Sequence, residues 1–313
     1  MKTEQRYRGR ISQTGIYFGK LIRMFIYQSD WKMLVMAALI AGLVTIAVGR
    51  NLFVTQEGTM TGCFALVCVC LWNGFFNSIQ VVCRERDIIK REHRSGMHIS
   101  SYVAAHMVYQ LLLCVVQTII LLVICYLADI HFPTGGLVTG SFLIDAFLSL
   151  LLVTYAADVS AIAISSLVHN TTTAMTVMPF MLIFQLVFSG QFFQLEGALA
   201  RLKTITIINW GQKCLCALGN YNGLPMATAW SMLYRFREVE VQGVKPMQQL
   251  LDYLSENNMK EQVMQVAGQY NTNPAFVYTR ENILQSWGAL LLITLVFAVI
   301  AVILLKLIDR DKR

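Results

Sequence analysis

The apolar residues of this chain are gathered into six long runs, and this pattern restricts the fold more than any other feature. Each run is close to the length of about 20 residues that a helix needs to cross a lipid bilayer. A helix also satisfies its own backbone hydrogen bonds, which lipid cannot do. Charged residues make up 14% of the 313 residues, whereas soluble domains carry about 25%. We therefore expect an all-α polytopic membrane protein with six transmembrane helices, at about residues 31–49, 61–83, 101–127, 141–168, 172–194 and 285–307.

Residues 1–30 precede the first run and have a different character. They are basic and then amphipathic, because apolar residues recur at helical spacing with Lys20 and Arg23 between them. This pattern is typical of a helix that lies in the membrane interface and does not cross it. The apolar positions are Ile16, Phe18, Leu21, Ile22, Phe25 and Ile26.

Basic residues mark one side of the membrane. Residues 84–96 hold five Lys or Arg and three acidic residues, and both ends of the chain are also basic. The loops 50–60 and 128–140 contain Arg50 and no other Lys or Arg. With six spans, all the basic segments fall on one side, which the positive-inside rule assigns to the cytoplasm. We expect a multi-pass protein of a bacterial cell membrane, surrounded by lipids, with both termini in the cytoplasm. The net charge of +7 reflects this topology, and nucleic acid is not an expected partner.

The connection 195–284 differs from the other loops because it is long, polar and of mixed charge. We expect it to form an external cap between spans five and six, with a soluble amphipathic helix at 246–266. The chain then divides into the interfacial helix 1–30, spans one to five at 31–194, the cap at 195–284, and the last span with its tail at 285–313.

No catalytic arrangement is recognisable in the sequence. The five histidines lack metal-binding spacing, and Cys214 and Cys216 lack the further ligands of a zinc site. The segment from Gly15 to Lys20 is one residue shorter than a phosphate-binding loop and lacks its Ser or Thr. We expect a chain that is not itself an enzyme and that holds no metal or cofactor.

Three groups of polar or aromatic residues lie inside the expected spans. Asp158 is near the middle of span four, where a carboxylate either faces a wet cavity with a function or hydrogen-bonds a neighbouring helix. In span two, Asn73 and Asn77 are one turn apart and share a face. That face, with Trp72 and Phe76, suits either an amphipathic ligand or interhelical hydrogen bonds. In span five an aromatic stripe with an adjacent amide forms either a binding wall or a packing surface; it consists of Phe180, Phe184, Gln185 and Phe188.

An ordered set of short motifs follows span two. The stretch Glu85-Arg86 is followed by Arg91-Glu92-His93-Arg94-Ser95-Gly96 and then by Ser100-Ser101-Tyr102, which opens span three. This order resembles the membrane domain of G-subfamily ABC transporters, in which a short intracellular helix has a glutamate at each end. The stretch from Gly96 to Tyr102 is one residue shorter here. The small-residue run 156–166 and Phe188-Ser189-Gly190 also agree, so the resemblance covers nearly the whole chain.

The resemblance implies a type-2 exporter fold in which two copies, or this chain and a paralogous permease, enclose a central cavity. Spans two and five line that cavity in the family, which implies ligand contacts for Trp72, Asn73, Phe76, Asn77, Phe180, Phe184 and Gln185. The residues after the Phe-Ser-Gly motif form an upper valve in relatives. Here the gate positions are Phe188, Gln191 and Phe192, and the glutamine departs from a purely apolar valve.

The intracellular helix of the family, here 84–94, couples the membrane domain to an ATPase. Glu85 and Glu92 are two turns apart on one face, and Asp87 and Arg91 form a favourable i, i+4 pair. Ile88 and Ile89 offer an apolar docking position, and Arg86 completes the expected coupling set. Because the chain shows no ATPase motif, we expect ATP and magnesium to bind a partner ATPase subunit or domain. A solvated loop that fixes topology is the alternative interpretation of this segment.

These inferences predict the permease subunit of an ATP-driven ABC exporter that moves an amphipathic or lipid-like substrate out of the cytoplasm or the inner leaflet. The alternative is a membrane sensor or scaffold whose external domain binds a ligand or partner. A membrane-embedded enzyme would need a catalytic constellation that Asp158 alone does not supply.

Overall fold

The computed structural model describes residues 9–27, 30–191, 193, 195–240 and 244–307. These residues form twelve α-helices and five short 3₁₀ helices, with no β-sheet. The α-helices are α1 (Arg10–Tyr27), α2 (Lys32–Val48), α3 (Gln56–Ser78), α4 (Val81–Arg94), α5 (Ile99–Leu127), α6 (Phe142–Leu167), α7 (Thr171–Val187), α8 (Ile207–Leu218), α9 (Ala227–Arg235), α10 (Pro246–Glu256), α11 (Lys260–Tyr270) and α12 (Arg280–Lys306). The 3₁₀ helices are η1 (Gly49–Asn51), η2 (Gly197–Ile205), η3 (Tyr221–Gly223), η4 (Phe236–Glu238) and η5 (Pro274–Phe276).

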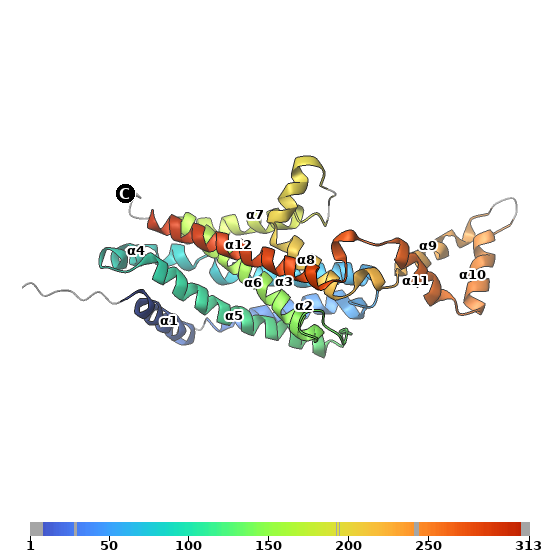
Figure 1. The fold of residues 1–313 in the computed structure, drawn as a ribbon, viewed down its shortest axis with the longest axis horizontal. Coiled ribbons are helices and arrows are strands. Elements are labelled where there is room, and N and C mark those ends of the chain that lie inside the picture. Colours follow the sequence, from blue (N-terminus) through green and yellow to red (C-terminus); the bar gives the residue numbers. More distant parts are fainter. Residues whose placement is uncertain (1–8, 28–29, 192, 194, 241–243, 308–313) are drawn as a thin grey trace, which may run out of the picture.

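The long helices lie side by side in one elongated bundle (Figure 1). Among the described residues, five helical segments are long and apolar enough to cross a membrane: Lys32–Asn51, Gln56–Arg94, Ile99–Leu127, Phe142–Leu167 and Arg280–Lys306. The expectation of an all-helical protein with several membrane-spanning helices is therefore confirmed at this level.

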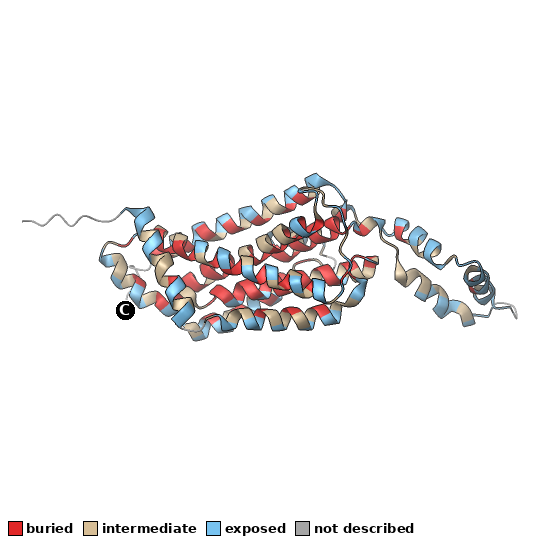
Figure 2. Cartoon of the chain, turned by 90° about the horizontal axis from the view of Figure 1, so that it is seen from below, coloured by how far each residue is buried: buried red, intermediate tan, exposed pale blue. Residues whose placement is uncertain are grey.

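Helices α3 and α6 form the centre of the bundle, where the buried residues gather (Figure 2). At Gly74 of α3 an added Cβ would overlap the Thr154 carbonyl oxygen and lie 2.7 Å from the Ala157 Cβ of α6. Glycine is therefore required here to let the two backbones approach, which is the usual role of small residues between membrane helices.

Helix α7 is shorter than the span expected at 172–194. It has 17 residues, contains Pro179 and ends at Val187. The chain turns at Ser189, whose hydroxyl donates to the Leu186 carbonyl, and at Gly190, whose φ is +78°. At 1.5 Å per residue the helix is about 25 Å long, somewhat less than the hydrocarbon thickness of about 30 Å.

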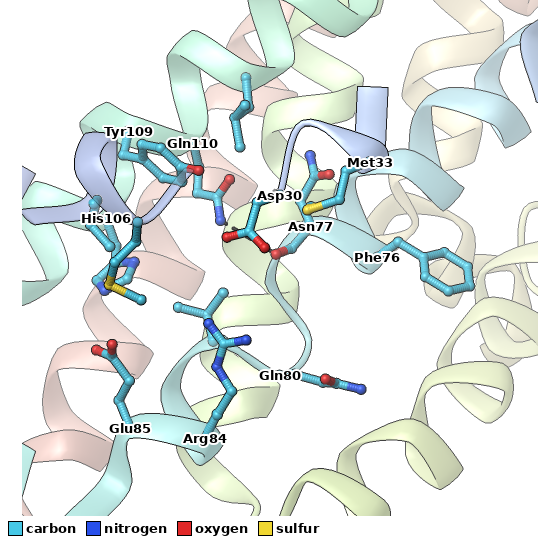
Figure 3. Close-up of a pocket in the computed structure, with 14 residues that line it drawn as sticks. Asp30, Met33, Phe76, Asn77, Gln80, Arg84, Glu85, His106, Tyr109 and Gln110 are labelled. Carbon is cyan, nitrogen blue, oxygen red and sulfur yellow. Dashed lines mark hydrogen bonds between the residues drawn. The ribbon is translucent and has the colours of Figure 1, made fainter. Parts of the chain in front are cut away.

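A break separates α3 from α4, so the intracellular helix begins at Val81 and not at residue 84 as expected. The two turn residues, Ile79 and Gln80, interrupt what is otherwise one helical rod of 39 residues. Figure 3 shows the chain changing direction at this point.

The segment 195–284 contains two different structures. Helix α8 packs in the bundle against α3, α6 and α12, and Ile207, Ile208 and Cys214 to Leu218 are buried. Helices α9, α10 and α11 instead project beyond the end of the bundle (Figure 1). The helix expected at 246–266 is wrong as one element: it is divided into α10 and α11 by a turn in which Asn258 has a φ of +54°.

Candidate functional site

The first turn of α4 is fixed to the end of α6. The hydroxyl oxygen of Ser165 accepts hydrogen bonds from the backbone N–H groups of Val82 and Cys83, at 3.1 and 3.2 Å. These N–H groups have no partner within their own helix, so a serine from a neighbouring helix supplies the cap. Arg86 donates from Nη1 to the carbonyl oxygens of Ser166 and Val168, at 3.2 and 3.0 Å. The start of α4 and the end of α6 therefore form one joined unit.

Glu85 connects α4 to two further helices. Its carboxylate is 6% exposed and accepts a hydrogen bond from the Tyr102 hydroxyl of α5 at 3.2 Å. It also lies 3.5 Å from the ammonium nitrogen of Lys20 in α1. A buried carboxylate needs such partners because water does not reach it.

Glu92 lies on the same face of α4 as Glu85 and also contacts α1. The Tyr17 hydroxyl donates to its Oε2 at 2.6 Å. Burial, followed by this hydrogen bond and the charge of Glu92, raises the pKa of Tyr17, so the phenol stays protonated and remains a donor. The backbone N–H of His98, in the turn after α4, donates to Oε1 of Gln13 in α1 at 2.9 Å.

The opposite face of α4 is open. Asp87, Ile88 and Arg91 are exposed and follow one another at i, i+1 and i+4. Four of the expected coupling residues do not belong to this surface. Ile89 is 0% exposed, and Glu85 is buried against α1 and α5. Arg86 is bonded to the end of α6, and Glu92 is bonded to α1. Ile89 belongs to a small apolar core with Tyr102 and residues of α12, because its side of the helix faces the bundle.

The aromatic pair of α3 lines a groove between α2 and α3, called the α2–α3 groove below. Trp72 and Phe76 are 43% and 44% exposed, and their rings stack with centroids 5.4 Å apart. The groove has a volume of about 460 Å³ and is walled on its α2 side by Met33, Met36 and other apolar residues.

The two asparagines of α3 are buried beside this groove. Asn77 exchanges two hydrogen bonds with Gln117 of α5, at 2.9 and 3.0 Å. The sequence left open whether this face binds a ligand or forms interhelical hydrogen bonds. At Asn77 the structure has interhelical hydrogen bonds, because Gln117 satisfies its amide. Asn73 is 6% exposed and still borders the groove.

Asp158 is 0% exposed and accepts a hydrogen bond at Oδ1 from Ser78, the last residue of α3, at 2.8 Å. Its Oδ2 has no hydrogen-bond partner within the described residues. The carboxyl group therefore fastens α6 to α3 directly before the break that leads into α4.

The aromatic residues of α7 are less buried. Phe180 is 68% exposed, and Phe184 contacts Phe188 with ring centroids 4.9 Å apart. Gln185 does not extend this aromatic surface as expected: it is 4% exposed, and its Oε1 accepts the backbone N–H of Ile207 at 2.8 Å. That N–H is at the first residue of α8, where it has no partner in its own helix. Gln191 is half-buried, and Phe192 lies outside the described residues.

In a comparison with protein families, residues 21–211 match the family described as ABC-2 type transporter. This region is more than half of the 313 residues. The chain belongs to the ABC-2 type transporter family. No curated protein matches it. The ABC-2 transporter chain is thus a multi-pass membrane permease, the membrane component of a system in which a partner ATPase binds ATP.

Several contacts of this ABC-2 permease were not predicted from the sequence. Ser165, Tyr17 and Gln117 hold α4 and α3 in place. Two signals in the sequence point to the contacts of Ser165 and Tyr17. They are a serine pair at the end of span four and polar residues on the apolar face of residues 1–30. Helix α8 was also missed, although an apolar run of 10–14 residues is typical of a buried core helix. Among the described residues, no group of three or more potential metal ligands is present.

Proposed function

We propose that this chain is the permease subunit of an ATP-driven exporter that moves an amphipathic or lipid-like substrate out of the cytoplasm or the inner leaflet. The observation that carries the proposal is the two-sided α4. One face is bonded to α1, α5 and α6, and the other presents Asp87, Ile88 and Arg91 to solvent. A helix fixed on one side and open on the other is suited to receive force from a partner.

In this mechanism the partner ATPase docks on the open face of α4 and closes when it binds ATP and magnesium. Ser165 and Arg86 pass the displacement to α6, while Glu85 and Glu92 pass it to α5 and α1. The break between α3 and α4 lets α4 tilt while α3 stays packed on α6. A displacement of α4 thereby changes the spacing of the membrane helices.

The substrate path lies at the interface of two permeases, either two copies or this chain and a paralogous one. We assign its lining to Trp72, Asn73, Phe76 and Asn77 of α3 and to Phe180 and Phe184 of α7. The exposed rings of Trp72, Phe76 and Phe180 support this assignment, since they are free to contact a ligand or the second permease. Phe188, Gln191 and Phe192 form the upper gate.

The proposed topology has six spans, with α7 as the fifth, and places both termini in the cytoplasm of a bacterial cell. Helix α1 then lies in the inner interface, and α9 to α11 form an external cap. The apolar side chains of α1 that are exposed, such as Ile16 and Ile26, support contact with lipid.

The decisive experiment is co-purification of an ATPase with the tagged chain from its own membranes. The variant Ile88→Asp places a charge on the open face of α4 and is expected to lose most of the bound ATPase. Leu250→Asp makes the same change at an exposed position of α10 and should keep it. An unchanged ATPase yield with Ile88→Asp would contradict docking on this face. A stable complex without any ATPase would favour the sensor or scaffold.

Transmission is tested separately in the assembled complex. Glu92→Arg removes the acceptor for Tyr17 and is expected to lower substrate-stimulated ATP hydrolysis while the ATPase remains bound. Unchanged hydrolysis would reject α4 as the transmitting element.

A further inference from the structure

Two pockets meet at α2 and α3, and the mechanism above uses only part of them. One is a polar cavity of about 130 Å³ whose lining includes Asp30 and Gln110 (Figure 3). The other is the α2–α3 groove of about 460 Å³. Met33, Phe76 and Asn77 line both. The two pockets are therefore adjacent, and together they are called the depression below. The first has more polar residues in its lining than the second.

The polar cavity contains buried atoms that can form hydrogen bonds and have no partner. His106 and Gln110 are 2% and 1% exposed, and both line it. Within the described residues, neither Nδ1 of His106 nor Oε1 of Gln110 has a hydrogen-bond partner. The Gln110 Nε2 group donates to the Asn77 carbonyl oxygen at 3.5 Å, which leaves Oε1 able to accept from a ligand. Unsatisfied buried polar atoms are costly, so a ligand that donates to them is favoured.

Charges of both signs surround this cavity. Figure 3 shows the Asp30 carboxylate directed into the cavity, and the Arg84 side chain rises from α4 on its other side. In the part of the chain that the structure describes, neither residue forms an ion pair. Lys32 lies at the wall of the apolar groove. Glu85 also lines the cavity, but its carboxylate is paired with Lys20. Asp30 is therefore the acid left for a ligand, and together with the two basic groups it matches a zwitterionic ligand.

We propose that this depression binds one phospholipid with a primary-amine headgroup, such as phosphatidylethanolamine. Its ammonium group donates to the Asp30 carboxylate and to Oε1 of Gln110. Its phosphate lies at the rim with Lys32 and Arg84, and one acyl chain occupies the α2–α3 groove along Met36. This inference rests on the proposed function and deepens it, because the α2–α3 groove is lined by the same residues of α3 that are assigned to the substrate path. The proposed topology places this lipid in the cytoplasmic leaflet.

The size and chemistry of the cavity discriminate among headgroups. A volume of about 130 Å³ equals that of about four water molecules in the liquid, so it holds a small polar group and not a whole drug-sized ligand. A choline group has no N–H to give to Asp30 or Gln110. A glycerol headgroup with its anionic phosphate brings no cation for Asp30. The ethanolamine ammonium satisfies both acceptors with charge-assisted hydrogen bonds.

The experiment is native mass spectrometry of the purified chain in detergent, with phosphatidylethanolamine, phosphatidylcholine or phosphatidylglycerol of identical acyl chains titrated in turn. We expect phosphatidylethanolamine to be retained about tenfold more strongly than the other two, the size of effect that one charge-assisted hydrogen bond gives. Asp30→Asn should remove this preference. Asp252→Asn, the same change at an exposed position of α10, should leave it unchanged.

Gln110→Leu is the second variant, because it removes the unpartnered amide oxygen and loses only the long hydrogen bond from Nε2 to the Asn77 carbonyl oxygen. It should keep the fold, seen as an unchanged elution profile, and reduce the preference for phosphatidylethanolamine several-fold. Equal retention of all three lipids, or a preference that survives in both variants, would reject the site and indicate lipid bound to the general surface. Strongest retention of phosphatidylglycerol would also overturn the proposal, since Lys32 and Arg84 alone would then determine binding.

Discussion

The two ends of α3 support structures of opposite kinds. At one end α4 buries Val82, Cys83, Glu85 and Ile89 and is bonded through side chains to three other helices. At the other end α9 buries none of its residues, and α10 and α11 bury one each, Leu251 and Gly268. A region with many buried contacts moves as a unit with its neighbours, whereas a region with few opens at low cost.

The projecting end is held to α3 by two adjacent residues. Gln56 donates from Nε2 to the Gly268 carbonyl oxygen at 3.0 Å and accepts from Asn271 at 3.0 Å. The Glu57 carboxylate accepts the N–H groups of Ala227 and Thr228, at 3.1 and 2.7 Å, and so caps α9. Helix α3 therefore connects a region with many buried contacts, at α4, to a distal region with few, at α9 to α11.

The largest effect is expected in the contact between α3 and α6, because this contact supports both ends of α3. Gly74→Val places a branched side chain against the backbone of α6 and should cost more than about 3 kcal/mol, so that folded protein is largely lost. Thermal unfolding in detergent and the yield of monodisperse protein measure this. Gly288→Val is the control, because no described atom lies within 4 Å of its added Cβ. Equal stability of the two variants would mean that α3 and α6 do not approach as closely as described.

The next largest effect is expected at the α4 end of α3 alone. Ser165→Ala removes the hydroxyl that caps Val82 and Cys83 and should lower the free energy of unfolding by about 1–2 kcal/mol. Ser166→Ala is the matched control, since that hydroxyl bonds to Ile162 within α6 and its loss should cost less. Denaturation of the two variants side by side tests the cap, and an equal cost would reject it.

At the projecting end the effect should stay local. Glu57→Ala removes the cap of α9, worth about 1 kcal/mol, and should speed proteolytic cleavage within 227–270. The main thermal transition of the bundle should hardly move. Glu256→Ala, at an exposed carboxylate of α10, should change neither measurement. A large shift of the main transition with Glu57→Ala would show that the two ends are not independent.

An effect of similar size is expected at Tyr17. Tyr17→Phe removes one hydrogen bond to Glu92 and should lower stability by about 1 kcal/mol. Because the folded pKa of Tyr17 is raised above its ordinary value of 10, this stabilisation is fully present below pH 10. It is lost as the pH rises through the raised pKa.

The difference between wild type and Tyr17→Phe should therefore stay constant between about pH 7 and 9. The control is Tyr270→Phe, at a tyrosine that is 88% exposed, which should show no difference at any of these pH values. A difference that disappears already below pH 9 would mean that Tyr17 ionises normally and does not donate to Glu92.

The sequence by itself determined the class of fold and the position of its principal charged helix. Runs of about 20 apolar residues have few alternatives to membrane helices, because lipid cannot satisfy a free backbone. The charged segment after span two was expected in water for another reason, because charged side chains are costly to place in lipid. The order of short motifs around it was enough to indicate the ABC-2 family, which the family match established.

Tertiary structure alone decided which face of each helix is buried, which is exposed, and which partners its polar side chains have. Helical spacing groups Glu85 with Glu92, but it cannot show that Lys20, Tyr17 and Tyr102 receive them, since these partners are distant in sequence. It cannot show either that Ile89 is buried while Ile88 is exposed. Apolar residues all around a membrane helix carry no periodic signal, because lipid and protein interior are similar in polarity. The partners of polar side chains are therefore fixed only when the helices pack together.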